Sequence, residues 1–170
     1  GVVHGDLAAR TCLVDSEKRV RVGDYGLARQ EFASDYPSVT VGGSAAAPLP
    51  IRWMAPETMG DVSILTTQTD VWSFGVAVWE IITLANNPYA RKGSSQVAKH
   101  VKAGGRLQEP KSGAPAGLFA AGCSPCFAED PSKRPSFADL LAALTTLAAQ
   151  AAAAETAADV AGAGAMSPEP

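Results

Sequence analysis

The sequence has few charged side chains, and those it has show no excess of positive charge. Of 170 residues, 14 are Lys or Arg and 17 are Asp or Glu, so 18% are charged and the formal net charge is −3. Soluble domains usually contain about 25% charged residues. Because no basic block is present, the composition argues against a protein that binds nucleic acid or an anionic membrane surface.

Long apolar runs are also lacking. The longest, residues 71–85, is interrupted by Ser73, Glu80 and Thr83, whereas a membrane span needs about 18 or more apolar residues. The sequence also shows no basic segment followed by an apolar one, which is the pattern of a secretory signal. We therefore expect a buried helix here and no membrane segment within this chain.

Cysteine is scarce, with 3 residues in the chain. This odd number, together with the absence of an Asn-x-Ser/Thr sequon, favours a reduced, intracellular setting. Cys123 and Cys126 have CxxC spacing, but no second pair or nearby His completes a zinc site. Ordinary buried thiols are therefore favoured over a metal or redox role.

The elements that the sequence predicts are mainly helical. Apolar runs at 11–14 and 19–22, separated by a polar stretch, predict a small β-hairpin. Residues 23–50 show no sustained periodicity, and this length of exposed loop is usually functional. Further helices are predicted, from their apolar spacing and end signals, at residues 66–84, 94–102, 115–127 (a weaker candidate) and from 135 onward.

The composition after Gln150 changes to Ala, Gly and a few acidic residues. Such a segment can be helical, but it has little apolar surface to bury. We therefore expect residues 150–170 to form an Ala-rich, low-complexity tail that is frayed or disordered.

Three short motifs occur in a fixed order along the chain. They are HGDLAART at 4–11, DYG at 24–26 and APE at 55–57, with DVWSFG at 70–75 and KRP at 133–135 further on. This set resembles the catalytic half of a protein kinase, which has H-R-D-L-x-x-x-N, D-F-G and A-P-E in this order. The strings DLAAR and PIRWMAPE are similar to the tyrosine-specific, receptor-type branch. The DYG turn bears a weaker likeness to the lemur tyrosine kinases.

The resemblance implies a mainly α (α+β) fold over residues 1–149, namely the C-terminal lobe of a kinase domain with a small β-hairpin at the catalytic loop. The Gly-rich loop and strand lysine of the N-terminal lobe are absent from these 170 residues, so the lobe itself is expected to be absent. The implied activity is transfer of the ATP γ-phosphate, with Mg, to tyrosine hydroxyls of protein substrates. A receptor-type kinase would place this lobe in the cytoplasmic part of a membrane receptor.

The resemblance also assigns catalytic and metal-binding roles. Asp6 matches the carboxylate that orients the acceptor hydroxyl and accepts its proton, and Arg10 matches the arginine that helps to place the phosphate and the acceptor tyrosine. Asp24 matches the carboxylate that holds Mg²⁺. Thr11 stands where the family has an Asn ligand of a second Mg²⁺, and its hydroxyl is a poorer metal donor than an amide carbonyl.

Further roles concern the substrate and the frame of the site. Pro50, Trp53 and Met54 match a shelf under the substrate tyrosine. Glu57 and Arg134 match a buried ion pair that ties this shelf to the helical core.

Three residues of the frame lie around the catalytic loop and the metal-binding turn. Asp70 matches a carboxylate that accepts hydrogen bonds from the catalytic-loop backbone. His4 and Gly26 are structural, His4 by packing beneath the metal-binding turn and Gly26 as part of that turn.

Two features bear on regulation and activity. Gly5 replaces the family's Arg, so a phosphate on the loop would lack a bidentate partner. Tyr36 lies where receptor-type kinases carry a phosphorylated loop tyrosine, and an ordinary loop tyrosine is the equal alternative. With Thr11, Gly5 keeps open a second function, a pseudokinase-type signalling scaffold. The missing N-terminal lobe keeps open a third, a truncated and inactive product.

Overall fold

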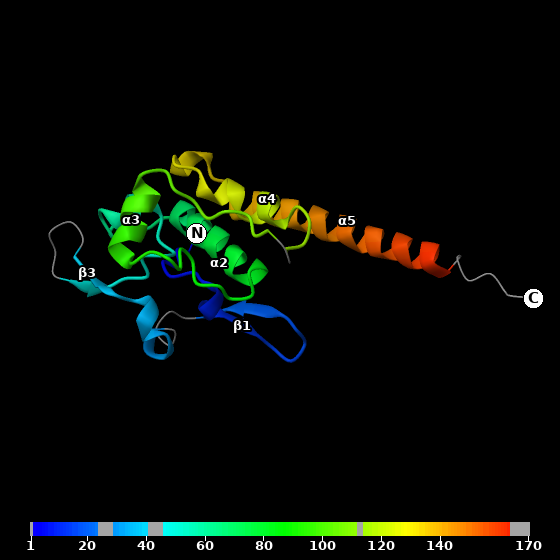
Figure 1. Cartoon of the computed structure of the whole chain (residues 1–170), viewed down its shortest axis with the longest axis horizontal. Coiled ribbons are helices and arrows are strands. Elements are labelled where there is room, and N and C mark those ends of the chain that lie inside the picture. Colours follow the sequence, from blue (N-terminus) through cyan, green and yellow to red (C-terminus); the bar gives the residue numbers. More distant parts are fainter. Residues whose placement is uncertain (1, 24–28, 41–45, 112–113, 164–170) are drawn as a thin grey trace, which may run out of the picture.

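The computed structural model describes residues 2–23, 29–40, 46–111 and 114–163. These residues are mainly helical, with two small two-stranded sheets, and the expected fold class is confirmed. Figure 1 shows helix α2 (Thr67–Ile82) between the β-hairpin on one side and helices α4 (Leu118–Gly122) and α5 (Phe137–Ala163) on the other.

The predicted hairpin is confirmed near the start of the chain. Strand β1 (Cys12–Val14) pairs antiparallel with β2 (Val20–Val22), directly after the short 3₁₀ helix η1 (Ala9–Thr11). Asp15 closes the turn, because its backbone N–H donates to the carbonyl of Arg19 over 3.0 Å. This compact hairpin fixes the end of the loop that carries Asp6.

The segment 23–50 holds more structure than its lack of periodicity predicts. A 3₁₀ helix, η2 (Ala33–Asp35), is followed by strand β3 (Ser38–Val39), which pairs antiparallel with β4 (Ala47–Pro48). The strands have two residues each, too few for an alternating pattern to show in the sequence. A further 3₁₀ helix, η3 (Pro56–Met59), begins at the APE motif.

Helix α2 is the centre of the core, as its apolar sequence predicts. Its N-cap is Thr66, whose hydroxyl accepts the backbone N–H of Thr69 while the Thr69 hydroxyl accepts the N–H of Thr66. Val71, Trp72 and Val76 are fully buried. Three short elements of the second half pack against this helix, namely α4 and the 3₁₀ helices η4 (Ser124–Phe127) and η5 (Pro131–Lys133), whereas α3 (Ser94–Lys102) packs against η3.

Helix α5 extends further than expected. Ser136 caps it, because the hydroxyl accepts the backbone N–H of Asp139 and donates to the Asp139 carboxylate. The helix then continues to Ala163, so residues 150–163 are helical where the sequence predicts a frayed or disordered tail. Alanine has the highest helix propensity, and adding turns to a helix that is already nucleated costs little. In Figure 1 this end projects away from the body, and side chains 151–158 are exposed.

The same helix bears on our expectation of no membrane segment. Among the described residues, Phe137–Ala158 is long and apolar enough to cross a membrane, and only 6% of its best window is buried. Its length and composition alone do not place it in a membrane, so the expectation of no membrane segment stays a prediction. Leu140, near the start of the same stretch, is 2% exposed and belongs to the core cluster.

Candidate active site

The catalytic-loop candidate Asp6 lies at the centre of a buried polar cluster. Its carboxylate is bound on one side by Arg10, with 2.8 Å from Nη2 to Oδ1. On the other side the hydroxyl of Tyr36 donates to Oδ2 over 2.7 Å. Arg10 Nε also donates to the Tyr36 hydroxyl over 2.9 Å. The structure thus brings together three residues that are predicted to have catalytic or regulatory roles.

Tyr36 is buried at this position, with 6% of its surface exposed. Burial, and then the hydrogen bond to Asp6, raise the pKa of its hydroxyl above the usual value. The hydroxyl therefore keeps its proton and donates a hydrogen bond to the carboxylate. This contact differs from the long exposed loop that the sequence predicts for the segment.

Arg10 is held by more than its ion pair. Its guanidinium carbon lies 4.2 Å from the ring centroid of Trp53 and 4.8 Å from that of Tyr36. Nη1 also reaches the carboxylate of Asp35 at 3.5 Å. Burial raises the pKa of Asp35, and the nearby guanidinium groups oppose that shift.

The loop that carries Asp6 is anchored to the N-terminal turn of α2. The backbone N–H groups of His4 and Gly5 donate to the two oxygens of Asp70, over 2.7 and 2.9 Å. His4 Nδ1 accepts the backbone N–H of Asp6, and its Nε2 lies 2.9 Å from the carbonyl of Gly23. This pattern assigns the proton to Nε2.

Gly5 adopts a backbone conformation that glycine favours, with φ of +75°. A Cβ at this position would lie 3.2 Å from Cδ1 of Leu65. The residue that replaces the family's Arg therefore suits the local backbone, and a larger side chain would strain it.

Of the metal-binding candidates, Thr11 alone lies within the described residues. Asp24 and Gly26 lie outside those residues. The Thr11 hydroxyl donates to the carbonyl of Ala8 over 2.9 Å and accepts the Ala8 N–H over 3.1 Å. Thr11 as a whole is 2% exposed. Its hydroxyl therefore fits a cap of the loop backbone better than a magnesium ligand. No group of three His, Cys, Asp or Glu side chains that could hold a metal occurs among the described residues.

The predicted substrate shelf is a tight, buried turn. Trp53 is 2% and Met54 9% exposed, and the Trp53 N–H donates to the carbonyl of Pro50. Trp53 contacts Arg10 through its ring, which places one member of the shelf directly beside the Asp6 cluster.

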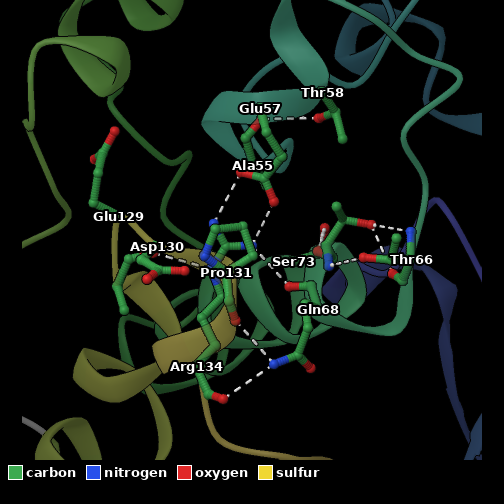
Figure 2. A network of polar contacts seen from close by, with 12 residues as sticks. Ala55, Glu57, Thr58, Thr66, Gln68, Ser73, Glu129, Asp130, Pro131 and Arg134 are labelled. Atoms are coloured by element: carbon green, nitrogen blue, oxygen red, sulfur yellow. Dashed lines mark hydrogen bonds and ion pairs between the residues drawn. The ribbon is translucent and has the colours of Figure 1, made fainter.

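The expected ion pair between Glu57 and Arg134 is present, and Figure 2 shows its surroundings. Arg134 binds both carboxylate oxygens, over 2.7 and 2.9 Å, and its side chain is fully buried. Its Nε donates to the carbonyl of Ala128, and Nη1 donates to that of Gln68. The Gln68 amide in turn donates to the Arg134 carbonyl over 3.0 Å. The pair joins the APE segment to the starts of α2 and α5.

Glu80 is a site residue that the sequence interpretation missed. Its Oε2 accepts the backbone N–H of Ala9 over 3.0 Å and the indole N–H of Trp53 over 2.8 Å. It is 9% exposed, and burial raises its pKa above the usual value. In the sequence, Glu80 stands out only as an interruption of an apolar run. One acid in a helix that is buried on every face was the signal that could have found it.

The family of the chain follows from its match to known proteins. The model of the protein tyrosine and serine/threonine kinase family matches residues 1–144, and the chain belongs to this family. It is 45% identical over 140 residues to the mouse proto-oncogene tyrosine-protein kinase ROS. The match covers 79% of this chain and 6% of that protein.

Two other relatives are similar at the same level. The human insulin receptor-related protein is 46% identical over 139 residues, covering 82% of this chain and 10% of that protein. Sevenless of Drosophila melanogaster is 43% identical over 150 residues, covering 79% and 5%. The chain thus spans a tenth or less of the length of these relatives.

Proposed function

We propose that this chain is the catalytic-loop lobe of a protein tyrosine kinase, which transfers the γ-phosphate of ATP to tyrosine hydroxyls of proteins. The observation that carries the proposal is the contact of a tyrosine hydroxyl with Asp6, 2.7 Å from Oδ2. This is the distance at which a general base receives a proton. A phenol side chain therefore fits against this carboxylate, and Tyr36 occupies the place of an acceptor tyrosine.

The residues around that hydroxyl have complementary tasks. Asp6 orients the acceptor oxygen and takes its proton as the oxygen attacks the phosphorus. Arg10 holds the carboxylate in place through Nη2 and supplies positive charge where the phosphoryl group arrives. The Trp53 ring packs against the guanidinium of Arg10. Phosphoryl transfer depends mainly on such positioning and charge.

ATP and Mg are the cofactors that the kinase family generally uses, and bound Mg–ATP would supply the phosphoryl group and offset its charge. The DYG motif supports Asp24 as the magnesium ligand in this proposal. Thr11 supports a second metal less well, because its hydroxyl is bonded to Ala8.

We further propose that residues 1–149 form the lobe and that the protein acts inside the cell on protein substrates, as the cytoplasmic part of a receptor. The family match over residues 1–144 supports the extent of the lobe. The odd cysteine count and the absence of a sequon support the reducing location.

Tyr36 is proposed as a regulatory residue of this site. While its hydroxyl is hydrogen-bonded to Asp6 and Arg10, Tyr36 occupies the position where the acceptor tyrosine of a substrate would bind. The loop around Tyr36 must therefore move before a substrate tyrosine can bind. Phosphorylation of Tyr36 would oppose its return, because a phosphate would stand against the Asp6 carboxylate.

The test is phosphotransfer to a tyrosine peptide by the full-length protein that contains this chain. Asp6→Asn keeps the size of the side chain and removes the base, and we expect a loss of about 10²–10⁴-fold. Asp61→Asn is the control and should keep full activity, because this exposed carboxyl accepts hydrogen bonds only from Ser63 among the described residues. Equal phosphotransfer by Asp6→Asn and wild type would contradict the proposal.

A second candidate function is a pseudokinase-type scaffold that docks partners without catalysis. The engaged hydroxyl of Thr11 is the observation that favours it. The same assay separates the two functions, because a scaffold would incorporate no more phosphate than its Asp6→Asn variant.

A further inference from the structure

Glu80 joins three parts of the molecule that are distant in the sequence. It lies in the last turns of α2, and one of its oxygens, Oε2, accepts both the Ala9 N–H and the Trp53 indole N–H. Ala9 belongs to the catalytic loop between Asp6 and Arg10. Trp53 belongs to the segment that leads to the APE motif. A single carboxylate thus fixes the loop and the candidate substrate shelf against the central helix.

Trp53 is held by α2 at two points, one on its ring and one on its backbone. Its indole N–H is bound by Glu80, and its backbone carbonyl accepts the hydroxyl of Ser73 over 2.8 Å. Trp53 is 2% exposed, and the hydrogen bond to Glu80 is the one that orients its ring.

The ring in turn supports the arginine beside the candidate base. The guanidinium of Arg10 lies 4.2 Å from the Trp53 ring centroid, and its Nη2 lies 2.8 Å from Oδ1 of Asp6. A desolvated cation over an indole is held by the negative face of the ring. A continuous series of contacts therefore runs from Glu80 through Trp53 and Arg10 to Asp6.

A carboxylate at this place needs an explanation. Burying an acid destabilises a fold unless hydrogen bonds compensate, and an apolar side chain would suit the rest of α2. Both hydrogen bonds that Glu80 accepts lead to the candidate site. The nearby charge of Arg10 also favours the ionised carboxylate.

We propose that Glu80 is a positioning residue for phosphoryl transfer: it fixes the Trp53 ring and, through the ring, the Arg10 guanidinium that aims Asp6 at the acceptor hydroxyl. The proposal rests on the proposed function. It adds a residue outside the three kinase motifs, and Glu80 itself touches neither the acceptor hydroxyl nor Asp6.

The first test is kinetic and uses the full-length protein with a tyrosine peptide. Glu80→Ala removes the oxygen that accepts both hydrogen bonds, and we expect kcat/KM for the peptide to fall by about ten- to a hundredfold, as displaced reacting groups do. The KM for ATP should not change, because Glu80 acts on the acceptor side. Glu80→Gln keeps an oxygen that can accept both hydrogen bonds and should recover most of the lost activity.

Val76→Ala is the matched control. Val76 lies one turn earlier on α2 and is fully buried, so its truncation destabilises the same helix without changing a bond to the loop. Both variants are assayed at a temperature where circular dichroism shows them folded. An equal loss of kcat/KM in Val76→Ala, or wild-type kcat/KM in folded Glu80→Ala, would overturn the proposal.

A second measurement does not depend on activity. Hydrogen exchange of the Arg10 Nε–H, followed by NMR, reports whether the guanidinium is still held. We expect faster exchange in Glu80→Ala than in wild type or Val76→Ala, and unchanged exchange would overturn the positioning role. If wild type itself transfers no more phosphate than Asp6→Asn, the proposed function fails, and the exchange result still decides whether Glu80 holds Arg10.

Discussion

Among the described residues, two buried arginine side chains pair with a carboxylate, and the two pairs are built differently. Arg134 binds both oxygens of Glu57, and its side chain also donates to the backbone carbonyls of Ala128 and Gln68. Arg10 binds one oxygen of Asp6, and its other polar contacts are the side chains of Tyr36 and Asp35. Both arginine side chains are almost fully buried, at 0% and 4% exposed.

The difference lies in what each partner can do. A backbone carbonyl within a packed turn cannot rotate away, so the Arg134 pair has one arrangement. A tyrosine or aspartate side chain can leave by rotation about its own bonds, so the Arg10 pair can exchange partners. We infer that the Arg134–Glu57 ion pair is a fixed joint between two segments. The Arg10–Asp6 ion pair is instead a rearrangeable site, whose partners can change.

The largest expected effect concerns the fixed joint. Arg134→Ala leaves the Glu57 carboxylate without its partner, and loss of one member of a buried pair costs about 3–5 kcal/mol of unfolding free energy. Urea unfolding followed by circular dichroism measures this cost. Lys133→Ala, at the exposed neighbouring residue, should stay within about 0.5 kcal/mol of wild type. Similar values for the two variants would show that the pair is not a joint.

A smaller effect is expected at the rearrangeable site. Tyr36→Phe removes a hydrogen bond to a charged group, which contributes about 1.5–3 kcal/mol. The loop should detach more readily, and the full-length protein should phosphorylate an added tyrosine peptide faster.

Tyr89→Phe is the control for this variant. Among the described residues, the buried hydroxyl of Tyr89 has no hydrogen-bond partner, so its removal should not lower stability. If Tyr36→Phe behaves as Tyr89→Phe does, in stability and in peptide phosphorylation, the Tyr36 hydroxyl does not hold the loop.

A smaller loss of stability is expected when Gly5, the glycine before Asp6, is replaced. Gly5→Ala places a Cβ at positive φ, which costs roughly 1–2 kcal/mol, and brings it 3.2 Å from Leu65 Cδ1. Gly104→Ala is the matched control, because Gly104 has φ of +85° with nothing within 4 Å of the added Cβ. Thermal unfolding should show the greater loss for Gly5→Ala. Equal losses would mean that Leu65 yields without cost.

The smallest effect at neutral pH concerns the thiols of the core and the site. Burial raises the pKa of both Cys123 and Cys126 to about 12. Because unfolded thiols ionise from about pH 9, the stability they contribute is present below pH 9 and is lost as the pH rises toward 12. With Ellman's reagent, partly exposed Cys12 should react in the folded protein and the other two only on unfolding. Fast reaction of all three would contradict this burial.

The sequence predicted the elements that have strong local signals. The Thr66 cap and the buried face placed α2 within about two residues of its ends, and Ser94–Lys102 was predicted at both ends. The ordered motifs led to Asp6, Arg10 and the Glu57–Arg134 pair. Such signals are local, so they can be read without knowledge of the rest of the fold.

What the sequence did not predict depends on contacts between distant segments. The bond between Tyr36 and Asp6 joins residues 30 apart, and the Glu80 bonds join residues 71 and 27 apart. No periodicity records such pairings. The continuation of α5 past Gln150 was missed for a different reason, because alanine predicts a helix but no burial to keep it.

The contact of Tyr36 with Asp6 has a consequence for the concentration of substrate that the proposed kinase needs. Tyr36 belongs to the same chain as Asp6, and it competes with every tyrosine in solution. The site binds a substrate only in the fraction of molecules in which Tyr36 has left Asp6. The apparent affinity for substrate falls by that fraction. With a hydrogen bond of about 1.5–3 kcal/mol, the fraction is on the order of one molecule in ten to one in a hundred. Release of one hydroxyl would then raise the effective substrate affinity by the same factor without altering a single group that does the chemistry.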